Sequence, residues 1–121
     1  MTSESILVVD DNPTDLNLIV SLLSHRGYRV LTAVDGEEAV AKASEERPRL
    51  VVLDIVLPGA SGYQICRQLK TAEETRESKV ILVSGKDQAS DRFWGMRQGA
   101  DEYVTKPFTS EQLLAAVDRQ L

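Results

Sequence analysis

The stretch that decides the fold is LVVLDIVLPG at residues 50–59, an apolar run that contains one carboxylate, Asp54, and ends in Pro58-Gly59. Continuous apolar residues without polar alternation predict a strand that is covered on both faces. A carboxylate at the end of such a strand, just before a turn, is expected at the edge of a sheet rather than in its middle. Asp54 is therefore the first candidate for a functional residue.

Two other short strands end in charged residues. Residues 6–9, ILVV, are followed by Asp10-Asp11, and residues 102–105, EYVT, are followed by Lys106-Pro107. If these strands are parallel neighbours of residues 50–54, three acids and one lysine converge at one edge of one sheet. Such a cluster can hold a divalent cation and accept a phosphoryl group.

Strand and helix patterns alternate along the whole chain. Strands are predicted at residues 5–10, 28–34, 49–54, 79–83 and 101–105, and helices at 13–26, from 35 to before 48, from 61 to about 70, at 88–98 and from 109 onward. This order predicts an α/β fold, a flavodoxin-like doubly wound five-stranded parallel sheet in the order 2-1-3-4-5 with five helices. The length of 121 residues fits one domain, 1–121.

Local signals mark the ends of the helices. The pairs Asp35-Glu38, Ser61-Gln64 and Thr109-Gln112 have the spacing of capping boxes, and Gly27 and Gly99 are suited to helix ends. The helix at 88–98 has few apolar residues, chiefly Phe93, Trp94 and Met96. Trp94 either packs within the fold or serves as an exposed anchor for a partner.

Composition excludes several classes of protein. The net charge of −5 gives no electrostatic basis for binding nucleic acid directly, and no apolar run approaches the length of a membrane span. Residues 1–5 lack the pattern of a signal peptide, and the one cysteine, Cys66, cannot form an internal disulfide. We therefore expect a cytoplasmic protein.

The residues at the carboxyl ends of the strands have complementary chemistry. Carboxylates suit Mg²⁺, and Asp54 is placed to act as the nucleophile toward phosphorus. The ammonium of Lys106 would neutralise charge on the transferring group, and the hydroxyl of Ser84 could then donate to it. Taken separately, Asp10-Asp11 could cap the first helix and Lys106 could be a solvated loop lysine.

The set formed by Asp10-Asp11, Asp54, Ser84-Gly85 and Lys106-Pro107-Phe108 resembles the receiver domain of two-component response regulators. The resemblance implies that Asp54 accepts a phosphoryl group from a histidine kinase and that Asp10, Asp11, Asp54 and the carbonyl of Val56 hold Mg²⁺. It also implies that Ser84 and Tyr103 form the switch, that the Lys106-Pro107 bond is cis, and that Lys106 contacts the phosphoryl group.

A narrower resemblance lies in residues 85–100, GKDQASDRFWGMRQGA, which are similar to the single-domain PilH-type regulators of twitching motility. It implies a signalling role in pilus-based motility or taxis. Output would pass to a downstream protein effector through the face made by the fourth helix, the fifth strand and the fifth helix. The protein would be a monomer or a phosphorylation-linked dimer.

Two other functions compete with a non-enzymatic switch. A Mg²⁺-dependent phosphohydrolase with an aspartyl intermediate needs a second acid two residues after the nucleophile, where this chain has Val56. A nucleotide-binding module needs a glycine-rich loop after the first strand, where this chain has the acidic segment at residues 10–13. The residues therefore favour a protein that is phosphorylated and then recognised by a partner, over an enzyme or a nucleotide-binding module.

Overall fold

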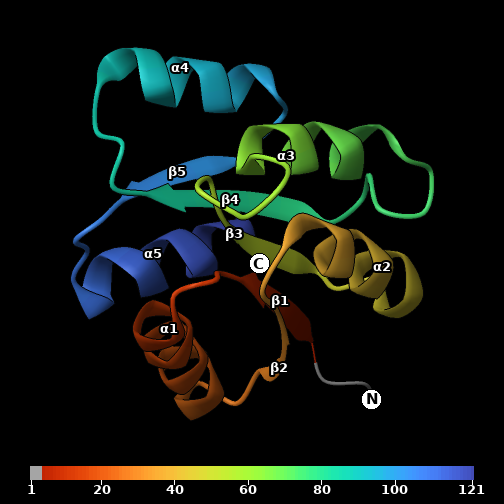
Figure 1. The fold of residues 1–121 in the computed structure, drawn as a ribbon. Helices are drawn as coiled ribbons and strands as arrows, with labels where there is room; N and C mark the ends of the chain where they lie inside the picture. The colour runs from red at the N-terminus through yellow and green to blue at the C-terminus, as the bar shows by residue number, and fades with distance from the viewer. Residues whose placement is uncertain (1–3) are drawn as a thin grey trace.

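A computed structural model describes residues 4–121 and contains one parallel sheet with helices on both faces (Figure 1). The strands are β1 (Ser5–Val9), β2 (Arg29–Ala33), β3 (Leu50–Asp54), β4 (Lys79–Ser84) and β5 (Glu102–Thr105). The helices are α1 (Pro13–His25), α2 (Gly36–Glu46), α3 (Gly62–Thr71), α4 (Ala89–Arg97) and α5 (Ser110–Gln120).

The strand order β2-β1-β3-β4-β5 confirms the predicted flavodoxin-like topology. Every neighbouring pair is parallel, so all five strands have their carboxyl ends at the same edge. Helices α2, α3 and α4 lie on one side of the sheet and α1 and α5 on the other (Figure 1). The uninterrupted apolar runs of β1, β3 and β4 are buried because side chains on both strand faces meet helices.

The predicted caps are largely present. The boxes Ser61-Gln64 and Thr109-Gln112 are complete in both directions. The Asp35-Glu38 box is wrong in one half: Asp35 accepts from the amide of Glu38, but the Glu38 carboxylate accepts from the amide of Val34. The side chain of Glu38 therefore reaches past the cap to the end of the preceding loop.

The amino end of α1 decides between two readings of the acidic pair. The cap is Asn12, whose Oδ1 accepts hydrogen bonds from the amides of Thr14 and Asp15. The reading of Asp10-Asp11 as the cap of this helix is therefore wrong. Neither carboxylate is the cap of α1.

Helix α4 exposes its large apolar side chains, unlike the usual surface helix, which buries them. Its one buried residue is Gly95, whereas Phe93, Trp94 and Met96 are 61%, 55% and 45% exposed. The guanidinium of Arg97 lies 5.8 Å from the centre of the Phe93 ring. Trp94 is thus an exposed side chain and not part of the core.

The space between α4 and the sheet leaves no room for a side chain at Gly95. A Cβ at Gly95 would lie 2.8 Å from Cδ1 of Leu82 and 3.2 Å from Cδ2 of Tyr103. These distances are shorter than carbon atoms tolerate without displacement, so the glycine lets α4 approach β4 and β5 closely.

None of the helices within residues 4–121 combines the length and apolar composition that crossing a bilayer requires. Residues 1–3, which belong to the segment searched for a signal peptide, lie outside the described part of the chain.

Candidate functional site

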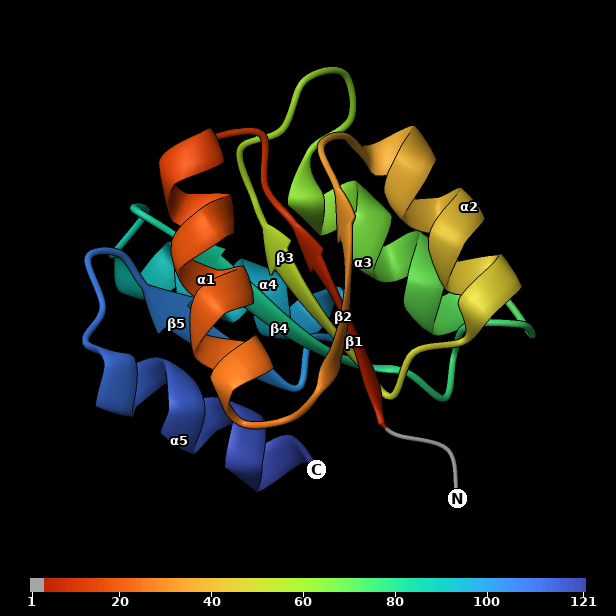
Figure 2. The same ribbon diagram turned by 90° about the horizontal axis from the view of Figure 1, so that it is seen from below.

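The topology brings three carboxylates together. Strands β1 and β3 lie side by side (Figure 2). Val9 pairs with Leu53 in their register, so the residues that follow β1 come next to Asp54. One carboxylate oxygen from each of Asp10, Asp11 and Asp54 lies within 4.8 Å of the others. Asp10 and Asp54 are buried and Asp11 is exposed, so the cluster opens to solvent on one side.

The donor set fits a hard divalent cation. Mg²⁺ takes oxygen ligands, keeps several waters and is often held by one or two carboxylates, which suits a cluster with one open side. Val56 follows the same strand, and its amide donates to Oδ1 of Asp54 at 3.2 Å while its side chain is 61% exposed. The use of the Val56 carbonyl as a ligand stays a prediction.

Lys106, which directly follows β5, contacts two carboxylates of the same cluster. Its Nζ lies 2.9 Å from Oδ2 of Asp10, 2.9 Å from Oδ2 of Asp15 and 3.5 Å from Oδ2 of Asp54. The Lys106-Pro107 bond is cis, as the resemblance implied. The reading of Lys106 as a solvated loop lysine is therefore wrong.

Burial and neighbouring charges shift the pKa values of Asp54 and Lys106. Burial and then the neighbouring charge of Asp10 raise the pKa of Asp54 from 3.8 to about 6, although Lys106 and the Val56 amide act in the opposite direction. Burial alone would lower the pKa of Lys106, but its hydrogen bonds to Asp10 and Asp15 and the charge of Asp54 raise it above its usual value. The ammonium of Lys106 thus stays charged. Ionisation of Asp54 is unfavourable in the folded protein, and a bound cation would make it more favourable.

Asp15 is the site residue that the sequence did not identify. It lies in the first turn of α1, where an acid is ordinarily explained by the helix dipole. The only sequence signal was its position on the turn that follows Asp10-Asp11. Its contact with Lys106, 91 positions away, joins the amino end of α1 to the loop between β5 and α5.

Ser84 and Tyr103 lie on neighbouring strands. Ser84 is buried at the end of β4, and its hydroxyl accepts a hydrogen bond from the amide of Lys86. Tyr103 is also buried, and its hydroxyl donates to the carbonyl of Lys86 at 2.7 Å. The loop after β4 therefore connects the two residues through the backbone of Lys86.

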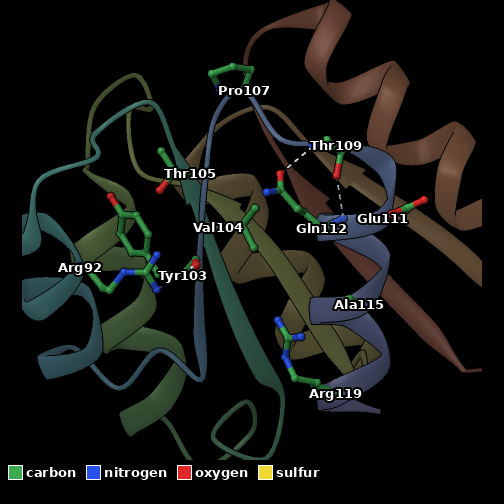
Figure 3. Close-up of a pocket in the computed structure, with 10 residues that line it drawn as sticks. All are labelled: Arg92, Tyr103, Val104, Thr105, Pro107, Thr109, Glu111, Gln112, Ala115 and Arg119. Atoms are coloured by element: carbon green, nitrogen blue, oxygen red, sulfur yellow. Dashed lines mark hydrogen bonds between the residues drawn. The ribbon is translucent and has the colours of Figure 1, made fainter.

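A groove of about 650 Å³ runs along β5 between α4 and α5 (Figure 3). The guanidinium of Arg92 lies 5.3 Å from the centre of the Tyr103 ring and donates to the Tyr103 carbonyl. On the opposite wall, Arg119 of α5 extends toward the groove (Figure 3). The aromatic ring of Tyr103 therefore lies beside an open surface that two arginines border.

The structure thus brings an acidic cluster and a lysine together at the carboxyl edge of a sheet with the order 2-1-3-4-5. A family model described as the response regulator receiver domain matches residues 6–118. The chain belongs to this family.

Among relatives, PilH of Pseudomonas aeruginosa is 45% identical over 116 residues, which cover 96% of this chain and 96% of PilH. PhoP of Bacillus subtilis, an alkaline phosphatase synthesis transcriptional regulatory protein, is 40% identical. That match covers 95% of this chain but 47% of PhoP, so the chain spans about half of this relative. The resemblance to PilH is thus found over nearly the full length of both proteins.

Solved structures show the same fold. The chemotaxis response regulator CheY4 of Vibrio cholerae superposes with a TM-score of 0.92 at 28% identity, covering 99% of this chain and 100% of that one. The receiver domain of the sensor histidine kinase PA1611 of Pseudomonas aeruginosa has a TM-score of 0.89 at 30% identity, covering 98% of each chain. That domain has a magnesium ion coordinated in its active-site cleft.

Proposed function

We propose that this chain, as one receiver domain over residues 1–121, is a phosphorylation-dependent switch that takes a phosphoryl group from a histidine kinase on Asp54. The observation that carries the proposal is the ammonium of Lys106 inside a cluster of acids, 3.5 Å from Asp54. A buried carboxylate beside a fixed cation and a candidate metal site is equipped to receive a phosphoryl group and to hold it.

In the transfer, a carboxylate oxygen of Asp54 forms a bond to phosphorus while the bond from phosphorus to the kinase histidine nitrogen breaks. That nitrogen keeps the bonding electron pair. Lys106 donates hydrogen bonds to the oxygens of the transferring group, where negative charge must be stabilised. A Mg²⁺ ion held by Asp10, Asp11, Asp54 and the carbonyl of Val56 would supply further charge neutralisation.

The signal then passes to the groove surface. Ser84 turns its hydroxyl toward the phosphoryl oxygens, and the loop at Lys86 follows because the Ser84 hydroxyl accepts from its amide. Tyr103, bonded to the carbonyl of the same residue, changes its position with the loop. A protein effector reads the α4–β5–α5 face, where exposed Trp94 and Phe93 provide apolar contact area.

The 45% identity with PilH supports a role in pilus-based motility or taxis. Within this proposal, binding is to proteins and not to nucleic acid, and the protein is either a monomer or a phosphorylation-linked dimer. We expect the phosphoryl transfer to take place in the cytoplasm, because a free cysteine such as Cys66 suits a reducing compartment. Val56, two residues after Asp54, supports a switch over a phosphohydrolase, since it offers no general acid.

The experiment is incubation with acetyl phosphate or carbamoyl phosphate and Mg²⁺, followed by intact mass and Trp94 fluorescence. We expect a mass gain of one phosphoryl group that is absent in Asp54→Ala and absent with a chelator. Lys106→Ala should still bind Mg²⁺ but should fail to couple phosphorylation to the fluorescence change. Continuous phosphate release from many substrates without a trapped adduct would contradict the switch.

A further inference from the structure

Lys106 has a third acidic partner, Asp15, which is not one of the three carboxylates that could hold a cation. The ammonium is 2.9 Å from Oδ2 of Asp15, as close as to Asp10 and closer than to Asp54. Asp10 and Asp54 belong to the group of carboxylates that could hold a cation, and Asp15 does not. Any cation bound there would weaken the attraction of Asp10 and Asp54 for Lys106 while leaving that of Asp15 intact.

The place of Asp15 is fixed by the fold. Oδ1 of Asn12 accepts hydrogen bonds from the amides of Thr14 and Asp15, which anchors the first turn of α1. The amide of Asn12 in turn donates to Oδ1 of Asp10 at 2.9 Å. The side chain of Asp15 is 36% exposed, while that of Lys106 is 18% exposed. The contact thus sits at the mouth of the site, where the ammonium can be drawn outward.

An ammonium has three N–H donors, and the three acids can occupy all of them. A phosphoryl group on Asp54 takes the place of the most distant of these partners, and it shares the ammonium with Asp10 and Asp15, which both lie at 2.9 Å. Resting on the proposed function, we propose that Asp15 is a positioning residue that competes with the phosphoryl group for the Lys106 ammonium. Asp15 thereby weakens the phosphorylated signalling state without touching the reacting atoms.

The test is the affinity of beryllofluoride, a mimic of the phosphoryl group, at fixed Mg²⁺, followed by ¹⁹F nuclear magnetic resonance and calorimetry. Asp15→Asn keeps the size of the side chain and removes its charge, so we expect beryllofluoride to bind at least threefold more tightly. Asp15→Glu keeps the charge and should bind beryllofluoride with the affinity of the parent protein. Glu37→Gln, which removes an exposed first-turn acid of α2, is the matched control and should leave the affinity unchanged.

A double mutant separates positioning from simple repulsion between Asp15 and the bound anion. In a Lys106→Met background, or in Lys106→Gln if the first variant does not fold, Asp15→Asn should no longer change the affinity. An undiminished gain in that background would overturn the proposal in favour of direct repulsion. An unchanged affinity in the Asp15→Asn single variant would also overturn it.

Failure of the proposed function gives a different result. Absence of any beryllofluoride binding to the unmodified protein in the presence of Mg²⁺ would count against Asp54 as the phosphoacceptor. Normal binding by the unmodified protein, combined with no response to Asp15→Asn, removes only the role of Asp15.

Discussion

The hydroxyl of Tyr103 donates a hydrogen bond to the backbone carbonyl of Lys86 at 2.7 Å, and this contact joins β5 to the loop after β4. The amide of the same Lys86 donates to the hydroxyl of Ser84. One peptide segment therefore contacts both Ser84 at the site and the hydroxyl of Tyr103 beside the groove between α4 and α5. Movement of that segment can change both ends together.

Replacement of Gly95 by alanine should displace Tyr103 or α4. The added methyl group would lie 2.8 Å from Leu82 and 3.2 Å from Tyr103, which costs about 1–3 kcal/mol of overpacking, partly offset by about 1 kcal/mol of helix propensity. We expect altered ring resonances of Tyr103 in the unphosphorylated protein. Leu82→Val removes part of the clash and should restore them. Gly85→Ala, where nothing lies within 4 Å of the new Cβ, should leave the stability of α4 unchanged.

Gly62→Ala should disturb the site through the backbone. A Cβ there would lie 2.3 Å from the carbonyl oxygen of Asp54 and 2.5 Å from Cα of Ile55, and neither backbone atom can move freely. We expect a loss of several kcal/mol in the free energy of unfolding and a loss of Mg²⁺ affinity. The neighbouring Ser61→Ala loses a cap and should cost about 1 kcal/mol with little change in Mg²⁺ affinity. Equal effects of both variants on metal binding would refute the specific role of Gly62.

Without metal, the ionisation of Asp54 should destabilise the fold. Its pKa is raised from 3.8 in the unfolded chain to about 6, chiefly by burial, so the folded state binds the proton more tightly. The contribution of Asp54 to stability therefore falls as the pH rises from about 4 through 6, by about 3 kcal/mol in total.

Asp54→Asn should remove this contribution and be more stable than the parent above pH 6, with a smaller difference near pH 4. Urea unfolding of both proteins in chelator from pH 4 to 8 measures the difference. Saturating Mg²⁺ should reduce it, because the cation stabilises the ionised carboxylate. A constant difference across this pH range would contradict the prediction.

Cys66 should be inert toward thiol reagents in the folded protein. Burial raises the pKa of its thiol to about 12, and its side chain is fully covered between α3 and the sheet. At pH 8 we expect modification no faster than unfolding, measured by absorbance with a disulfide reagent. The protein in urea should react with one equivalent at once, and rapid reaction of the folded chain would show that α3 opens locally.

Much of the fold was predictable because its signals are local in sequence. The apolar runs at 6–9 and 50–53 and the caps at Ser61 and Thr109 predicted the elements, and strict alternation predicted a parallel sheet with the order that the structure has. Parallel strands place their carboxyl ends together, so the meeting of Asp10, Asp11 and Asp54 followed from topology alone.

Two features were determined only by the tertiary structure. They are the contact of Asp15 with Lys106 and the orientation of α4 on the sheet. The sequence does not predict that Asp15 contacts Lys106, because that distance depends on how the amino end of α1 packs beside a loop far away in the chain. The few apolar residues of α4 gave no clear periodicity, and only packing against Leu82 and Tyr103 showed that Gly95 faces inward. Sequence patterns specify which elements form and where strands end, whereas the pairing of side chains across loops is fixed only when those elements are packed.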